Sequence, residues 1–264
     1  MNNTSGNTNL VQSVERALDI LNALSEFPNG CGIGELSKYV GLSKSTVHRL
    51  LSTLKHKEYV IQIKDNDKYM LGTQILYLSS CIRGNMDIIH ISKPYISKFV
   101  NEIGEVAHLC IPDESFKNII YIDKISPSNS NRSISMSSKI GKKAPIYCTA
   151  SGKLLLSQFS DEKIKNILKD IDFVKYTDNT IKNINDLLDD IHAVKTNSYA
   201  LDKVEYEDGI ICIAVPIFNS KREIAATISV SCVIIFKTID NLLEYREDLF
   251  LISKQISKLL GFIS

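Results

Sequence analysis

The chain has 264 residues, a formal net charge of +1 and 44% apolar residues. This length and apolar content predict two hydrophobic cores of ordinary size, and therefore two domains. No apolar run is long enough to span a bilayer, and residues 1–7 are polar and lack the apolar core of a secretion signal. We expect a cytoplasmic protein with no membrane partner.

Six cysteines are spread singly along the chain, without the paired spacing that zinc sites and redox dithiols use. They are Cys31, Cys81, Cys110, Cys148, Cys212 and Cys232. Because free cysteine behaves as a small core residue, we expect reduced and mostly buried thiols. The sequence predicts no metal site and no cofactor.

Two helices joined by a tight turn are predicted within residues 33–54. Leu36 and Val40 lie one helical turn apart, and Gly41 ends the first helix because glycine adopts left-handed backbone angles without a clash. Ser43 is placed to cap a second helix by accepting a hydrogen bond from a free amide. This arrangement is typical of a helix-turn-helix, whose second helix enters the major groove of DNA.

The second predicted helix has one apolar face and one basic face. The apolar face consists of Val47, Leu50, Leu51 and Leu54, at spacing i, i+3, i+4 and i+7. Residues 44–57 include four Lys or Arg and no acidic residue. The residues expected at DNA are Ser43, Lys44, Ser45, Thr46, His48, Arg49, Ser52 and Lys55. The alternative is that this basic face is an ordinary solvated surface.

Neighbouring segments complete a winged helix. Upstream, an apolar stripe follows Ser13 and predicts a further helix; it consists of Val14, Ala17, Leu18 and Leu21. Downstream, residues 59–64 and 68–72 predict two strands around an Asp-Asn-Asp turn. Three helices and a hairpin predict a winged helix-turn-helix domain over residues 10–72.

The remaining chain predicts a linker helix over residues 73–86 and a second, α+β domain over residues 87–264. Asp87 is expected to cap a helix that Pro94 kinks or breaks. Strands are expected at residues 106–111, 118–124 and 134–137, and a strand end at residues 146–149 that runs into a helix. A single helix over residues 241–260 is expected to close the domain.

The most informative part of the second domain is a predicted antiparallel hairpin of residues 210–217 and 224–232. Side chains alternate across a strand, so each strand has a bulky face and a small face. The small face carries Cys212, Ser229 and Ser231, which suit a small polar ligand. Backbone amides at a helix start in residues 149–152 would assist an anion. The alternative is that these hydroxyls populate an exposed sheet face.

Catalytic motifs are weak in this sequence. One segment resembles the end of a phosphate-binding loop, namely Ser151-Gly152-Lys153. However, Leu154 replaces the Ser or Thr that such a loop requires, and Tyr147 occupies the position of its first glycine. We expect no enzyme activity and no catalytic residues. The rival interpretation is a cysteine-based redox or metal sensor, or an enzyme built on the second domain.

Several segments, in order along the chain, resemble the IclR family of transcriptional regulators. They are residues 11–21, 42–51, 69–72, 148–153, 199–202, 205–206 and 209–216. The resemblance implies a winged-helix DNA-binding domain, a helical linker and a GAF-like effector domain, assembled as a homodimer or a dimer of dimers. It implies a regulator, more specifically a repressor, that binds double-stranded operator DNA and responds to a small metabolite such as a carboxylate or a sugar-derived acid.

The resemblance also assigns the effector site. The implied ligand contacts are Ala150, Ser151, Asp202, Cys212, Ser229 and Ser231, with Ser133, Met136 and Ala144 on the apolar wall. Relatives with a carboxylate pocket often have bulky apolar residues where this chain has Ser133 and Ala144. We expect Ser229 and Ser231 to donate to an anionic ligand and Asp202 to accept from a ligand hydroxyl.

Overall fold

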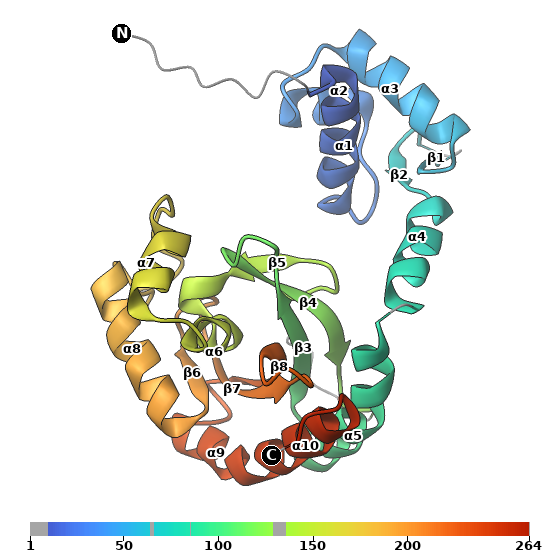
Figure 1. The fold of residues 1–264 in the computed structure, drawn as a ribbon. Helices are drawn as coiled ribbons and strands as arrows, with labels where there is room; N and C mark the ends of the chain where they lie inside the picture. Colours follow the sequence, from blue (N-terminus) through green and yellow to red (C-terminus); the bar gives the residue numbers. More distant parts are fainter. Residues whose placement is uncertain (1–9, 64–65, 85, 129–135, 264) are drawn as a thin grey trace, which may run out of the picture. The chain divides into compact units, whose positions relative to one another are not determined.

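The computed structural model describes residues 10–63, 66–84, 86–128 and 136–263. The chain divides into two compact units, Met1–Asn85 and Met86–Ser264 (Figure 1). The first unit contains helices α1 (Gln12–Ser25), α2 (Ile33–Tyr39), α3 (Lys44–His56) and α4 (Thr73–Gly84), with strands β1 (Val60–Gln62) and β2 (Tyr69–Leu71). The expected three helices and hairpin are confirmed.

The local signals that predicted the helix-turn-helix operate as expected. Gly41 has a φ of +67°, and the Ser43 hydroxyl accepts from the backbone amide of Thr46 at 3.3 Å. Val47 and Leu51 of α3 are fully buried against α1 and α2. The apolar face of α3 is therefore the core face, and its basic face is exposed.

The apolar stripe predicted for α1 is only partly correct, because two of its four residues, Ala17 and Leu21, pack against the core. The helix buries Ile20, Ala23 and Leu24, whereas Val14 and Leu18 are more than half exposed. Apolar residues occupy more of the circumference of α1 than one stripe. The face that contains Ile20, Ala23 and Leu24 packs on the core, and the face that contains Val14 and Leu18 is apolar but exposed.

The second unit contains one six-stranded antiparallel sheet in the order β5-β4-β3-β8-β7-β6. Its strands are β3 (Val106–Pro112), β4 (Asn118–Ile125), β5 (Lys143–Pro145), β6 (Ala200–Lys203), β7 (Ile210–Phe218) and β8 (Ile224–Val233). Its helices are α5 (Asp87–Ile103), the 3₁₀ turn η1 (Ile146–Cys148), α6 (Ala150–Ser157), α7 (Asp161–Leu168), α8 (Ile184–Asn197), α9 (Ile239–Glu244) and α10 (Arg246–Leu259).

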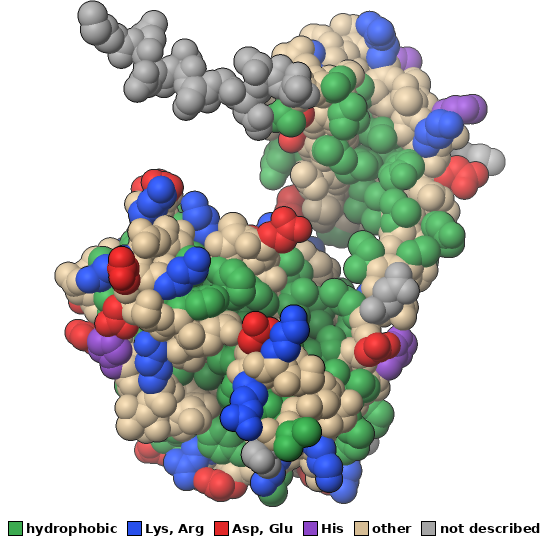
Figure 2. Space-filling view, in the orientation of Figure 1, with side chains coloured by type: hydrophobic (Ala, Val, Ile, Leu, Met, Phe, Trp, Pro, Cys, Tyr) green, Lys and Arg blue, Asp and Glu red, His purple; other side chains and the backbone are tan. Residues whose placement is uncertain are grey.

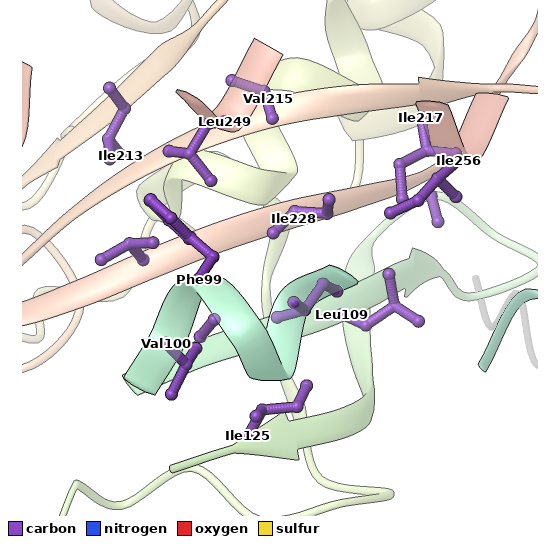
Figure 3. Close-up of a cluster of buried hydrophobic side chains, with 14 of the residues drawn as sticks. Phe99, Val100, Leu109, Ile125, Ile213, Val215, Ile217, Ile228, Leu249 and Ile256 are labelled. Carbon is purple, nitrogen blue, oxygen red and sulfur yellow. The ribbon is translucent and has the colours of Figure 1, made fainter. Parts of the chain in front are cut away.

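The two faces of the hairpin β7–β8 pack as predicted. The bulky face carries Ile213, Val215 and Ile228 into a core shared with Phe99 of α5 and Leu249 of α10 (Figure 3). The small face is covered in part by a helix, since Ala150 and Leu154 of α6 pack against Ala214. Small side chains on the sheet therefore admit α6 at close range and leave space beside its start.

Several expected boundaries are wrong. Asp87 is the first residue of α5 and not its cap, and α5 continues through Pro94. The closing helix is two helices, because Tyr245 ends α9 and precedes α10. The strand end expected before α6 is the 3₁₀ turn η1.

The strand expected at residues 134–137 falls partly outside the described residues, and its described part, Met136 and Ser137, is not in a strand. Strand β5 instead pairs with β4 a few residues later. Within the described part of the chain, no helix combines the length and apolar character needed to cross a membrane.

Candidate functional site

A small cavity lies between the small face of the sheet and the start of α6. Its volume is about 30 Å³, which is room for about two waters. The residues that line it are His108, Ile119, Tyr121, Met136, Ser138, Thr149, Ala150, Ser151, Asp202, Tyr206, Glu207, Ile210, Cys212, Ser229 and Ser231. The cavity combines hydroxyls, two carboxylates (Asp202 and Glu207) and aromatic walls.

Strand register brings the polar floor of this cavity together. Cys212 of β7 lies opposite Ser231 of β8, and the Cys212 sulfur is 3.1 Å from the Ser231 hydroxyl oxygen. On the other side of β8, His108 of β3 lies opposite Ser229. Residues from three strands therefore share one floor, as alternation of side chains requires.

The start of α6 forms the opposite wall. The Thr149 hydroxyl caps the helix by accepting from the Gly152 amide at 3.2 Å. Ala150 and Ser151 are the first two residues of the helix, where backbone amides point out of the helix toward its start. The buried Ser151 hydroxyl has no nitrogen or oxygen partner among the described residues. This wall supplies donors suited to an anion.

Gly152 explains why α6 begins so close to the preceding turn. A Cβ at this position would overlap the carbonyl of Ile146, because the backbone of η1 lies directly against the helix. Only glycine permits this approach. Gly152 is thus a packing feature, and it sets the position of the helix start at the cavity.

Lys153, the next residue, is not a phosphate ligand. Its side chain is 1% exposed, and its ammonium lies 2.6 Å from Asp190 and 2.7 Å from Glu205. Glu205 also accepts from the backbone amide of Lys203. The cation neutralises carboxylates behind the cavity wall, which agrees with rejecting a phosphate-binding loop.

Asp202 lines the cavity beside that ion pair and is almost fully buried. Burial first, and then the negative charge of Glu205, raise the pKa of Asp202 to about 7. Backbone hydrogen bonds from Glu205 and Tyr206 and the charge of Lys153 act in the opposite direction. Near neutral pH the carboxyl therefore exists in both forms, and the protonated form can donate to an anion.

Most of the effector residues expected from the resemblance meet at this cavity. Those that line it are Met136, Ala150, Ser151, Asp202, Cys212, Ser229 and Ser231. Ala144 does not line it: this residue lies one strand further, opposite Ile119, in a neighbouring apolar cluster. Ser133 lies outside the described residues.

Reasoning from sequence missed His108, Tyr121, Tyr206 and Glu207. Alternation in β3 does put His108 and Cys110 on one face, away from Ala107 and Leu109. That signal becomes useful only when β3 is known to lie beside β8. The neighbouring strand is more than a hundred residues away in sequence.

In the first unit, the residues expected at DNA lie on the exposed side of α3, and Thr46 is half-buried. Figure 2 shows Lys, Arg and His side chains along the surface of this helix. Some of these groups have local partners. The Lys55 ammonium donates to Gln62 of β1 at 2.9 Å, and the Ser52 hydroxyl donates to the His48 carbonyl.

A groove between α1 and α3 adds a residue that sequence analysis missed. Arg16 and Ser13 of α1 line it together with Arg49 and Thr46 of α3. Two arginines, one from each helix, therefore line the same groove beside α3. An arginine at the start of α1 is difficult to assign from sequence, because helix surfaces carry many solvated cations.

Four of the six thiols have pKa values raised above the ordinary value, which is the opposite of activation. Burial raises the pKa of Cys31 to about 11 and that of Cys110 to about 12, and it also raises the pKa values of Cys148 and Cys212. Among the described residues there is no group of His, Cys, Asp and Glu that could hold a metal ion.

A winged helix with an exposed basic second helix, joined in one chain to a domain with a cavity that polar side chains line, is typical of a DNA-binding regulator. A family model described as the IclR helix-turn-helix domain matches residues 13–63. A second, described as the bacterial transcriptional regulator IclR C-terminal, matches residues 82–258. The chain belongs to the IclR family of transcriptional regulators.

Individual relatives match over nearly the whole chain. The regulator KdgR of Dickeya chrysanthemi is 35% identical over 96% of this chain and 81% of the relative. The transcriptional repressor IclR of Escherichia coli K12 is 28% identical over 98% and 93%. The crystal structure of the Thermotoga maritima IclR covers 95% of this chain and 99% of its own, with a TM-score of 0.77 and 29% identity.

Proposed function

We propose that this protein is a repressor whose affinity for operator DNA is controlled by a small anionic metabolite bound in the cavity beside α6. The observation that carries this proposal is the convergence of Ser229, Ser231 and Ser151 with the start of a helix around one cavity. Repression is proposed because a relative matched over nearly the whole chain is named a transcriptional repressor.

The proposal divides the chain by role. Residues 10–72 form the DNA-binding domain, residues 73–86 the linker helix and residues 87–264 the effector-binding domain. Bases and phosphates are contacted by Ser43, Lys44, Ser45, Thr46, His48, Arg49, Ser52 and Lys55. Ser43 contributes chiefly by capping α3, since its hydroxyl oxygen accepts the Thr46 amide.

The chemistry of the ligand follows from the cavity. Serine hydroxyls and helix-start amides stabilise a carboxylate. Asp202 faces the same space, so the ligand presents a hydroxyl or carbonyl to it. Because the cavity volume is about 30 Å³, we propose that a small carboxylate or a sugar-derived acid enters as residues 136–138 move aside.

A catalytic or redox role is the rival, and the chemistry of the groups argues against it. Nucleophilic or redox cysteines need a lowered pKa, whereas burial raises the pKa of Cys110 and Cys212 beside the cavity. We propose that the protein has no enzymatic activity, no metal and no cofactor, and that it acts in the cytoplasm.

We further propose a homodimer, or a dimer of dimers. Helix α4 has no buried residue, and Figure 2 shows apolar side chains over its surface. Leu76, Tyr77 and Ile82 of α4 are each more than 60% exposed. Exposed apolar groups in such number mark an interaction surface, and a two-fold dimer suits a DNA duplex read in two half-sites.

The proposal is tested by replacing Ser229 and Ser231 together with alanine. Each hydrogen bond to a charged acceptor contributes roughly 1.5 to 3 kcal/mol, so the double variant should need far more effector to change its DNA affinity. Its operator affinity without effector should equal that of the unsubstituted protein, measured by fluorescence anisotropy. Thr227→Ala, on the same strand but away from the cavity, is the matched control. A normal effector response in the double variant would show that the ligand binds elsewhere.

A further inference from the structure

His108 connects the floor of the cavity to the segment that covers it. The residue is 2% exposed, and its Nδ1 lies 3.4 Å from the Ser231 hydroxyl on β8. Its Nε2 lies 2.8 Å from the hydroxyl of Ser138. One imidazole ring therefore touches both the sheet and residues 136–138.

Residues 136–138, which we call the covering segment, are held by charged side chains. The Lys124 ammonium donates to the carbonyls of Ser138 at 2.8 Å and Met136 at 3.4 Å. The Glu207 carboxylate accepts from the Ser137 amide at 3.0 Å and from its hydroxyl at 2.7 Å. The segment has a defined position, and His108 is its hydrogen-bonded link to the cavity floor.

The His108 ring is neutral. Burial, and then the positive charge of Lys124, lower the pKa of His108 to about 3. A neutral imidazole has one nitrogen that donates and one that accepts. The ring can therefore donate to Ser231 or to Ser138, but not to both.

This choice decides what Ser231 offers to a ligand. If Nδ1 carries the proton, it donates to the Ser231 oxygen, and the Cys212 thiol at 3.1 Å can donate to the same oxygen. Both lone pairs are then used, so the Ser231 hydroxyl is left as a donor toward the cavity. If Nε2 carries the proton, Ser231 donates to Nδ1 and presents only acceptor capacity to the ligand.

We propose that His108 is a positioning residue that selects an anionic effector by holding Ser231 as a donor. A bound carboxylate favours the form with the proton on Nδ1, and in that form Ser138 donates to Nε2. The identity of the ligand is thereby transmitted to the covering segment. This inference rests on the proposed function, which makes the cavity the effector site.

The test compares two small molecules that differ in a single group. Pyruvate carries a carboxylate where hydroxyacetone carries a neutral hydroxymethyl group. His108→Asn retains a polar group near the Nδ1 position, whereas His108→Leu retains none. We expect His108→Leu to lower pyruvate affinity by about tenfold or more, because the Ser231 hydroxyl is then no longer held as a donor to the charged carboxylate. His108→Asn should lose much less, and hydroxyacetone affinity should change little in either variant, measured by calorimetry on the full chain.

A second measurement does not depend on replacing a buried residue. The two imidazole nitrogens of the native protein, labelled with nitrogen-15, report by NMR which one is protonated. We expect the proton on Nδ1 when pyruvate is bound. A proton that stays on Nε2, or equal losses for both probes in His108→Leu, would overturn the inference.

The two proposals fail in distinguishable ways. If Ser229→Ala/Ser231→Ala loses pyruvate binding but His108→Leu does not, only the role of His108 is wrong. If neither variant alters binding, or the native protein binds neither probe, the assignment of the cavity is wrong and this inference falls with it. The Ser138→Ala variant, which removes the partner of Nε2, should weaken the effect of pyruvate on DNA affinity more than it weakens pyruvate binding.

Discussion

Lys153 is a buried cation whose removal should be costly. Its ammonium pairs with Asp190 and Glu205, and Glu205 is itself almost fully buried. Removing one partner of a buried ion pair leaves an uncompensated charge, at a cost of roughly 3 to 5 kcal/mol. We expect Lys153→Met to lower the free energy of unfolding of the second unit by about that amount, measured by denaturant titration.

The control for this prediction also removes the buried carboxylate that Lys153→Met leaves unpaired. Adding Glu205→Gln to Lys153→Met should restore part of the lost stability, because the buried carboxylate is then gone. If the double variant is no more stable than Lys153→Met, packing of the lysine stem is the dominant contribution and the ion pair is not.

Asp202 predicts a pH dependence for effector binding. Its pKa is raised to about 7, so a neighbouring anion binds more tightly when the carboxyl is protonated. Affinity for a carboxylate should therefore fall as pH rises through about 7, because proton uptake on Asp202 accompanies binding. His108, with its pKa lowered to about 3, does not titrate in this range. Calorimetry in buffers of different ionisation enthalpy measures the proton uptake directly.

The matching variant is Asp202→Asn, which should bind a carboxylate with nearly constant affinity across the same pH range. The raised pKa also affects stability: the folded state holds the proton more tightly than the unfolded chain, so the free energy of unfolding should fall as pH rises from about 4 to about 7. A native protein whose carboxylate affinity is independent of pH would contradict this account of Asp202.

At the scale of elements, α3 combines a buried apolar face with an exposed face that presents Lys44 and Arg49 near its start. If Arg49 reads a base, Arg49→Ala should cost about 1 to 3 kcal/mol of operator binding and relax specificity. Lys57, at the other end of the helix, should contact phosphate. Lys57→Ala should therefore weaken binding to all DNA sequences alike, and the salt dependence of the affinity should correspond to about one fewer released ion. Titrations of operator and scrambled DNA at several salt concentrations separate these effects. Equal weakening on both DNAs would remove Arg49 from base recognition.

At the scale of the whole molecule, α4 predicts the oligomeric state. The apolar surface of α4 is solvated in a single chain, and a second copy would bury it. Leu76→Glu together with Ile82→Glu should dissociate the protein to monomers, seen by analytical ultracentrifugation, and weaken operator binding. Effector affinity should be unchanged, since neither residue lines the cavity. An assembly that survives these changes must be held together elsewhere.

The sequence by itself determined the features whose causes are local. The glycine turn at Gly41, the cap at Ser43 and the apolar spacing of α3 act within a few residues, so their structure could be derived directly. The two faces of β7 and β8 were also predictable, because alternation is a property of each strand. The resemblance to a family then assigned seven of the fifteen residues that line the cavity.

Only the tertiary structure decided which strands lie side by side. The order β4-β3-β8-β7 puts His108 beside Ser229 and Ser231, and no local pattern encodes a pairing between segments so far apart in the chain. The burial of Lys153 between carboxylates from α8 and the segment after β6 has the same origin. In α1, the sequence left two apolar faces available, and packing against α2 and α3 chose between them. Long-range contacts select among local conformations of equal energy. The selected conformation is therefore known only once the tertiary structure is known.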